Sequence, residues 1–187
     1  SEILVEKALD LIQENNLKSI LELGVGSGCI IAAILSNSIG TKAVGVDISE
    51  QAIMTAKSNL IKNGIKNFDL VVSDWGLSLN RTFDIIISNP PYIKTNEIKN
   101  LNKNVKDHDP LISLDGGLDG LDCYRVIANQ STHLINDKGY ILVEIGHDQA
   151  KGVEKIFGNN DFLLTNKVKD YSNLDRVLIF VKKKIKK

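Results

Sequence analysis

The chain has 187 residues, 43% of them hydrophobic and 25% charged, a size and composition that suit one globular domain with its own core. Lysine and arginine together number 23, as do aspartate and glutamate, so the formal net charge is zero. This balance argues against tight general binding to a nucleic-acid backbone, which needs a net basic surface. Because no apolar run reaches transmembrane length and no signal peptide is recognisable, we expect a cytoplasmic protein without membrane contacts.

Cysteine and histidine usage gives no sign of a metal or a disulfide. Cys29 and Cys123 lie far apart and outside any Cys-x-x-Cys context, so we expect both to be buried, small side chains in a reducing compartment. His108, His133 and His147 are scattered and lack the spacing of zinc ligands. No metal site is therefore predicted.

Strands and helices alternate along the first half of the chain. Apolar residues at helical spacing predict a helix over residues 3–12, and another begins at Cys29. Ser49 is a suitable N-cap for a third helix, which we expect to end near Asn63 and Gly64. Strands are predicted at residues 19–21, 43–46, 68–72 and 83–88.

The second half opens with a long polar segment, residues 93–120, which we expect to form a mobile rim over a binding pocket because such long loops are uncommon unless functional. The remaining predicted elements are a helix at 121–135, a strand at 140–145, a helix after Gly146, and strands at 162–164 and 177–181, joined by a polar loop that contains Asp170, Asp175 and Arg176. This alternation predicts an α/β fold with a doubly wound, mostly parallel sheet and a final hairpin. We expect the Lys-rich residues 182–187 to form a solvated tail or linker.

A glycine-rich turn follows the first predicted strand and opens the helix at Cys29. It reads Glu22-Leu23-Gly24-Val25-Gly26-Ser27-Gly28, and its glycines allow a sharp turn and close approach of a ligand to the backbone. Asp47 ends the next strand, roughly 20 residues further on, where a ribose-binding carboxylate is found in nucleotide-binding βαβ units. The G-x-G-x-G spacing differs from the G-x-G-x-x-G of dinucleotide-binding enzymes, which disfavours a nicotinamide dehydrogenase.

The most informative motif is Asn89-Pro90-Pro91-Tyr92, directly after the strand at 83–88. Carboxyl ends of parallel strands are where open α/β sheets bind ligands, and two prolines stiffen the chain there. The Asn89 amide oxygen and the Pro90 carbonyl can accept hydrogen bonds from a planar –NH₂ group, with Tyr92 against its flat face. The motif therefore predicts a site for an amide or amino nitrogen.

With these motifs the chain resembles S-adenosylmethionine-dependent methyltransferases of the Rossmann-like class I. More narrowly, it is similar to the protein-(glutamine) methyltransferases that modify peptide-chain release factors. The narrower resemblance rests on residues 109–125, on Glu144-Ile145-Gly146-His147-Asp148-Gln149 and on Asp175-Arg176. It implies a seven-stranded, mostly parallel sheet with an antiparallel C-terminal hairpin, S-adenosyl-L-methionine as cofactor and a release factor as protein substrate.

The resemblance also implies roles for individual residues. The group implied to hold the target glutamine consists of Asn89, Pro90, Pro91 and Tyr92. The group implied to bind the cofactor consists of Glu22, Gly24, Val25, Gly26, Ser27, Gly28, Asp47, Ile48, Asp74, Trp75 and Asn89. Within the second group, Trp75 is expected against the adenine rather than as a core anchor. Glu22 has two interpretations, a contact with the cofactor's amino group or a bond to backbone N–H groups.

The sequence departs from the family pattern at three places. Asp109 stands where the family usually has Glu, and Asn173 replaces a usual Gly, a change that the loop tolerates because Asn adopts left-handed φ more readily than most residues. The chain also starts where the family's catalytic domain starts, so we expect residues 1–187 to form a single catalytic domain. The family's N-terminal helical domain, which is expected to recognise the protein substrate, is then missing.

Two alternative functions stay open. Adenine-N6 and cytosine-N4 methyltransferases of DNA and RNA use the same Asn-Pro-Pro-Tyr residues, but the zero net charge and the absence of a target-recognition domain disfavour this function. The second alternative is a cofactor-binding module that is inactive without its missing partner domain.

Overall fold

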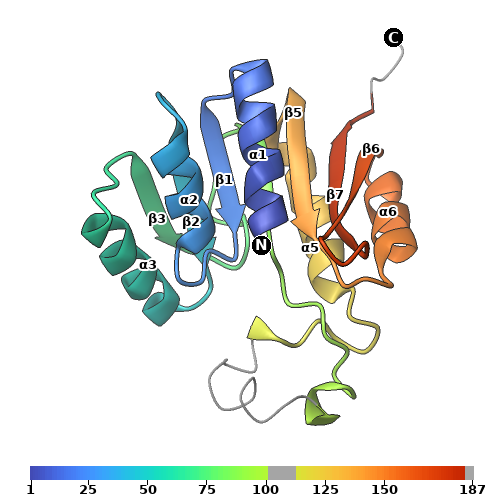
Figure 1. Cartoon of the computed structure of the whole chain (residues 1–187). Coiled ribbons are helices and arrows are strands. Elements are labelled where there is room, and N and C mark those ends of the chain that lie inside the picture. The colour runs from blue at the N-terminus through green and yellow to red at the C-terminus, as the bar shows by residue number, and fades with distance from the viewer. Residues whose placement is uncertain (101–112, 184–187) are drawn as a thin grey trace.

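The computed structural model describes residues 1–100 and 113–183, which form a seven-stranded sheet covered by helices on both faces (Figure 1). The strands are β1 (Ser19–Leu23), β2 (Lys42–Asp47), β3 (Phe68–Val72), β4 (Phe83–Ser88), β5 (Ile135–Glu144), β6 (Phe162–Lys169) and β7 (Asp175–Lys182). The helices are α1 (Glu2–Asn15), α2 (Cys29–Asn37), α3 (Glu50–Lys62), the short 3₁₀ helix η1 (Ile98–Asn100), α5 (Asp122–Leu134) and α6 (Ala150–Asn159).

The sheet has the strand order β3-β2-β1-β4-β5-β7-β6. Strands β1 to β5 pair in parallel with one another, whereas β7 runs antiparallel to both of its neighbours, β5 and β6. The predicted mostly parallel sheet with a C-terminal hairpin is therefore confirmed. The last strand, β7, lies inside the sheet beside β5, and β6 occupies the edge.

Two apolar layers cover the faces of the sheet. Helices α1, α2 and α3 pack on one face, and α5 and α6 pack on the other (Figure 1). Strand β4 supplies both layers, because Phe83 and Ile86 belong to the layer under α5 and α6 while Ile85 and Ile87 belong to the opposite one. Burial on both faces explains why the central parallel strands are continuous apolar runs in the sequence.

The cap predicted for α3 is present. The Ser49 hydroxyl oxygen accepts the Ala52 N–H at 3.2 Å, and the helix ends at Lys62. Asn63 follows as the C-cap, and Gly64 has the left-handed φ of 72° that ends many helices.

Three predicted boundaries were wrong. Strand β5 begins at Ile135 rather than at residue 140, because Ile135 already pairs with Phe83 before an irregularity in the register. The turn between β6 and β7 contains Asp170, whereas Asp175 and Arg176 lie in β7. Lys182 also lies in β7 instead of a tail, and of the predicted tail only residues 184–187 lie outside the described part of the chain.

The turn between β6 and β7 contains the predicted left-handed residue. Asn173 has a φ of 62°, and the Asp170 carboxylate accepts the Ser172 N–H at 2.9 Å and the Leu174 N–H at 3.0 Å. The expectation that Asn173 tolerates a left-handed φ in this loop is confirmed. The Asp170 carboxylate holds the turn in shape.

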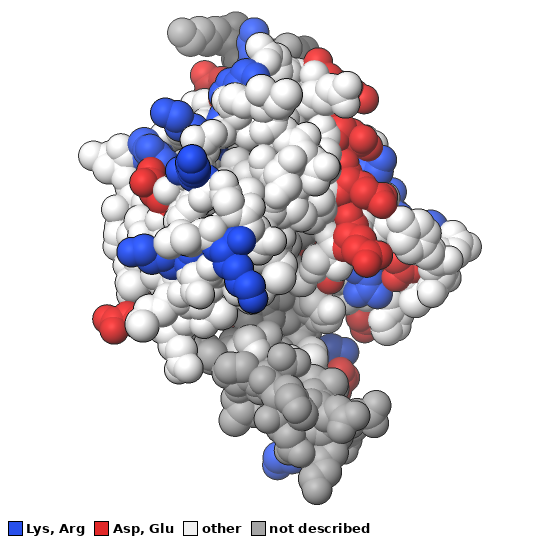
Figure 2. Space-filling model, turned by 60° about the vertical axis from the view of Figure 1, so that its left-hand side comes forward, with Lys and Arg blue, Asp and Glu red and all other residues white. Residues whose placement is uncertain are grey.

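The acidic and basic side chains are equal in number but unevenly distributed over the surface. Helix α1 carries exposed Glu2, Glu6, Asp10 and Glu14 at four-residue intervals, which places them on one face of the helix. Figure 2 shows acidic side chains gathered along one side of the view and basic ones on the other. In the described part of the chain, no helix is long and apolar enough to cross a membrane.

Candidate active site

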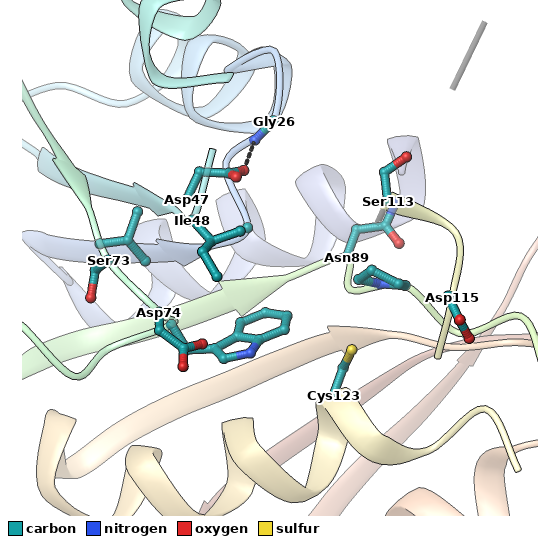
Figure 3. Close-up of a pocket in the computed structure, with 13 residues that line it drawn as sticks. Gly26, Asp47, Ile48, Ser73, Asp74, Asn89, Ser113, Asp115 and Cys123 are labelled. Carbon is teal, nitrogen blue, oxygen red and sulfur yellow. Dashed lines mark hydrogen bonds between the residues drawn. The ribbon is translucent and has the colours of Figure 1, made fainter. Parts of the chain in front are cut away.

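A cavity of about 360 Å³ opens at the carboxyl ends of β1 to β4. Figure 3 shows Gly26 and Asp47 on one side of this cavity and Asn89 and Ser113 on another. Its lining residues are Gly24, Gly26, Val46, Asp47, Ile48, Ser73, Asp74, Trp75, Asn89, Pro91, Ser113, Asp115 and Cys123. The cavity therefore joins the glycine-rich turn to the Asn-Pro-Pro-Tyr turn, as the sequence predicts.

The glycine-rich turn is held by its own backbone. The N–H groups of Gly24 and Val25 both donate to the Val46 carbonyl at 2.9 Å, and the Gly28 N–H donates to the Val25 carbonyl at 2.8 Å. All three glycines have positive φ, at 76° for Gly24, 52° for Gly26 and 80° for Gly28. Residues with a Cβ rarely adopt such angles, so glycine is required at these positions.

Asp47 fastens the glycine-rich turn to the end of β2. One carboxylate oxygen accepts the Gly26 N–H at 2.9 Å, and the other accepts the Ser49 N–H at 3.0 Å (Figure 3). Each carboxylate oxygen has a further lone pair, so the side chain can still accept hydrogen bonds from hydroxyl groups in the cavity. Asp47 thus shapes the turn and presents a charge to the cavity.

Glu22 is buried below the turn and does not line the cavity. Its carboxylate accepts the Ile31 N–H in the first turn of α2 at 3.2 Å. Burial raises the pKa of Glu22 well above its usual value, and the nearby Asp47 charge adds to the rise. The geometry favours the backbone-binding interpretation of Glu22, with its hydrogen bond going to the helix that the turn opens.

Asp74 and Trp75 follow β3 and line the cavity. Trp75 has a φ of 49°, which is uncommon for a residue with a Cβ, and the next residue, Gly76, donates its N–H to the Gln130 side chain at 2.6 Å. A Cβ added at Gly24 would lie 3.7 Å from the Trp75 ring, so the indole faces the glycine-rich turn. The indole also packs against the core layer under α5, so Trp75 belongs to both the core and the cavity wall, and its contact with adenine stays a prediction.

The Asn-Pro-Pro-Tyr turn leaves β4 toward the same cavity. Asn89 and Pro91 line it, Pro90 is buried and Tyr92 is half-buried. The Asn89 side-chain nitrogen donates to the Ser1 hydroxyl at 2.8 Å, which leaves the amide oxygen of Asn89 as an acceptor. The role of that oxygen as the acceptor for a target nitrogen stays a prediction.

The Tyr92 hydroxyl lies among charged groups behind the turn. Burial raises the pKa of Tyr92 and the Glu144 carboxylate adds to the rise, whereas the nearby Arg176 guanidinium opposes it. Arg176 is itself held by the Asp170 carboxylate at 3.1 Å and by the Ile145 carbonyl at 3.0 Å. The Asp170-to-Arg176 segment therefore places a positive charge near the Tyr92 phenol.

The predicted rim contributes to the cavity through its described end. Ser113 and Asp115 line the cavity, and the chain at Asp115 bridges to Ile93, with the Ile93 N–H donating to the Leu114 carbonyl at 3.0 Å. The Asp115 carboxylate also accepts the Thr95 hydroxyl at 2.7 Å. The central part of the predicted rim, residues 101–112, lies outside the described residues, and so does Asp109.

The predicted site residues and the residues that line the cavity are not all the same. The predicted site residues that do not line it are Glu22, Val25, Ser27, Gly28, Pro90 and Tyr92. Ser113 and Asp115 belong to the predicted rim but were not singled out as site residues, and the other lining residues that were not predicted are Val46, Ser73 and Cys123. Val46 and Ser73 sit next to predicted residues at strand ends, so proximity to those motifs was an available signal, and Cys123 lies within the stretch 109–125 that carries the narrower resemblance.

The prediction that both cysteines are buried was wrong. Cys29 is exposed because it starts α2 beside the glycine-rich turn, where its sulfur lies 3.1 Å from the Ser27 hydroxyl. Cys123 is half-buried at the start of α5, and burial raises the pKa of its thiol to about 11. Among the described residues, no group of three or more acidic, histidine or cysteine side chains is arranged to hold a metal ion.

Comparison with known proteins defines the class that this fold and cavity represent. Residues 1–107 match the family model described as the methyltransferase small domain, and the chain belongs to that family. Solved structures agree on the fold, among them a ribosomal protein L11 methylase from Lactobacillus delbrueckii subsp. bulgaricus, with a TM-score of 0.70 at 17% identity over 96% of this chain and 77% of that chain. An rRNA N2 G1207 methyltransferase of T. thermophilus, solved with AdoMet and guanosine, gives 0.64 at 18% identity over 97% of this chain and 42% of that one.

Curated relatives narrow the similarity to release factor glutamine methyltransferases. The protein of that name from Agrobacterium fabrum is 40% identical over 96% of this chain and 64% of its own length. Those from Fusobacterium nucleatum and Thermodesulfovibrio yellowstonii are 40% and 41% identical, over 100% and 98% of this chain and 53% and 67% of their own lengths. The chain thus spans about half to two thirds of the curated relatives that it matches.

Proposed function

We propose that this chain transfers a methyl group from S-adenosyl-L-methionine to the side-chain amide nitrogen of a glutamine in a peptide-chain release factor. The observation that carries the proposal is the placement of Asn89 and Pro91 in the same cavity as Gly26, Asp47 and Trp75. The similarity to release factor glutamine methyltransferases supports the choice of glutamine over other amides. Release factors act in the cytoplasm, so the proposal places the reaction there.

The lining residues fit the proposed cofactor. Gly26 faces open space, with nothing within 4 Å of an added Cβ, so a ligand can approach the backbone. The Asp47 carboxylate offers acceptors for ribose hydroxyls, and Ile48 and Trp75 offer apolar surface for adenine. When bound, the cofactor supplies a sulfonium-activated methyl group whose S–C bond electrons stay on sulfur.

The Asn-Pro-Pro-Tyr turn solves the problem of a weak nucleophile. An amide lone pair is delocalised into its carbonyl, so the nitrogen must be held in line with the methyl group. The Asn89 amide oxygen and the Pro90 backbone carbonyl accept one hydrogen bond each from the two N–H groups of the target amide. The rigid prolines keep these two acceptors in place. With the cofactor bound, the N–C bond would form as the S–C bond breaks, the nitrogen would lose one amide proton to solvent water, and the two acceptors would stabilise the positive charge that develops there.

A labelling experiment tests the proposal. The chain is incubated with methyl-labelled S-adenosylmethionine and a release factor, a release factor whose candidate glutamine is replaced by glutamate, or bulk RNA and DNA. We expect label only in the unaltered release factor, located on the glutamine amide by mass spectrometry. Label in nucleic acid instead would establish the amino-methyltransferase alternative. Cofactor binding without transfer to any of these would support a module that needs a partner domain.

A further inference from the structure

The Asn-Pro-Pro-Tyr turn has few backbone N–H groups that could form hydrogen bonds within the turn. Pro90 and Pro91 have no N–H, so this stretch cannot form the backbone bonds that fix the glycine-rich turn. The turn's last carbonyl, that of Tyr92, accepts a hydrogen bond at 2.9 Å from the side chain of Gln149, far along the chain. The support for this turn therefore comes from elsewhere in the sequence.

Gln149 uses every hydrogen-bonding group of its amide. The side-chain nitrogen donates to the Tyr92 carbonyl at 2.9 Å and to the Gly120 carbonyl at 3.1 Å, and the side-chain oxygen accepts the Gly146 N–H at 2.9 Å. The residue is only 7% exposed. One buried amide thus joins the segment after β4, the segment before α5 and the segment after β5.

The surrounding backbone is packed around this amide with no spare room. A Cβ added at Gly120 would lie 2.6 Å from the Tyr92 carbonyl oxygen and 2.7 Å from the Gln149 nitrogen. A Cβ added at Gly146 would lie 2.9 Å from the Gln149 oxygen, and one at Gly116 would lie 2.8 Å from the Tyr92 Cα. The three glycines therefore allow the chain segments to come close together. The Gln149 amide then links these segments by hydrogen bonds.

We propose that Gln149 is a positioning residue for methyl transfer, because it fixes the Tyr92 carbonyl and so holds the Asn89 and Pro90 acceptors at the target amide. The inference rests on the proposed function for its kinetic consequence. Gln149 does not line the cavity, so its effect on the reaction passes through the turn. The segment that it joins through Gly120 leads to Asp115, which does line the cavity.

Two substitutions separate this role from a general loss of structure. Gln149→Glu keeps the shape and an acceptor for the Gly146 N–H, but its carboxylate has no donor for the carbonyls of Tyr92 and Gly120. We expect kcat to fall about 10²-fold, the usual consequence of misplacing a reacting group by about 1 Å, while cofactor affinity changes less than about twofold. Gln149→Met removes both donors without adding charge and should lower kcat at every pH.

The pH profile is the discriminating readout. As the pH falls, the carboxyl group introduced by Gln149→Glu takes up a proton and can donate to one of the two carbonyls. The rate of this variant relative to the parental enzyme should therefore rise toward low pH, whereas the relative rate of Gln149→Met should stay flat. Gln13→Glu on the exposed surface of α1 is the matched control for the added charge and should leave both rate and profile unchanged.

Hydrogen exchange supplies a readout that does not need a substrate. In Gln149→Met we expect faster exchange of the Gly116 and Gly146 amides, with the amides of β1 and β2 unchanged. If both variants exchanged and transferred methyl like the parental enzyme, the positioning role would be wrong. If the parental chain methylated no release factor, the proposed function would fail, and the exchange data alone would decide whether Gln149 holds the turn.

Discussion

The two halves of the cavity are held by different means. The cofactor half, built from the ends of β1 and β2, uses short-range contacts, since the glycine-rich turn bonds to Val46 and Asp47 on the neighbouring strand. The acceptor half, which is proposed to hold the methyl acceptor at the end of β4, depends on Gln149 from beyond β5, and the charge of Arg176 from β7 acts on its Tyr92 phenol. Local motifs thus specify the first half, whereas the second requires the completed sheet.

The largest expected effect is a loss of unfolding free energy when a glycine with left-handed φ is replaced by alanine. Gly64 (φ 72°) has nothing within 4 Å of an added Cβ, whereas at Gly120 (φ 74°) the Cβ would meet the Tyr92 carbonyl at 2.6 Å. Gly64→Ala should cost about 1–2 kcal/mol of unfolding free energy from backbone strain alone. Gly120→Ala should cost about 1–3 kcal/mol more from overpacking. Equal urea denaturation curves for the two variants would show that the acceptor half is no more tightly packed than the surface turn.

The second prediction separates binding from transfer. Asn89→Ala should lower the single-turnover methyl-transfer rate about 10²-fold or more, because it removes a polar contact made mainly in the transition state. Cofactor affinity should stay nearly intact, since it is spread over Gly26, Asp47 and Trp75. Asn89→Asp keeps the shape and an acceptor but loses the donor to Ser1. Asn129→Ala, on the exposed face of α5, is the control, and parental rates for Asn89→Ala would rule out the glutamine clamp.

The third prediction tests the cofactor half. Asp47→Ala should weaken S-adenosylmethionine binding by roughly 1.5–3 kcal/mol, the usual loss when a charge-assisted hydrogen bond disappears. The loss of its bond to the Gly26 N–H contributes as well, because the glycine-rich turn is then free to move. Calorimetry measures the affinity, with exposed Asp69→Ala on β3 as the charge-matched control. Unchanged affinity would remove Asp47 from the binding site.

The smallest effect is spectroscopic. Trp75 is the only tryptophan and lines the cavity, so its fluorescence should change when the cofactor binds. The titration midpoint should agree with the calorimetric affinity and shift with Asp47→Ala. An unchanged spectrum at saturating cofactor, with normal binding by calorimetry, would assign Trp75 to the core layer alone.

The same difference between the halves explains which site residues could be predicted from the sequence. The turn at Gly24 to Gly28 and the acid at Asp47 were predictable because each is a local signal at a strand end. Asn89 to Tyr92 was equally visible, since two prolines after an apolar strand are rarely accidental. Gln149, by contrast, acts through contacts with Tyr92 and Gly120 that exist only once distant segments meet.

The fold was predictable for a related reason. Strand β4 matched its predicted bounds because a buried parallel strand is apolar on both faces, and edge strand β3 matched because its short apolar run ends at polar residues. The start of β5 at Ile135 was missed because it depends on pairing with Phe83 across an irregular register. The exposed position of Cys29 was missed because residue type alone does not tell which side of a short helix faces solvent.

The position of β7 inside the sheet has a consequence for biosynthesis. Until residues 175–182 have been made, β5 presents an unpaired edge, and such edges invite pairing with other chains. Arg176, whose charge opposes the rise in the pKa of the Tyr92 phenol, belongs to this same late strand. A ribosome-bound chain that ends before β7 therefore contains all residues of the cofactor half but lacks Arg176, so we expect the surroundings of the Tyr92 phenol to be completed only with the last strand.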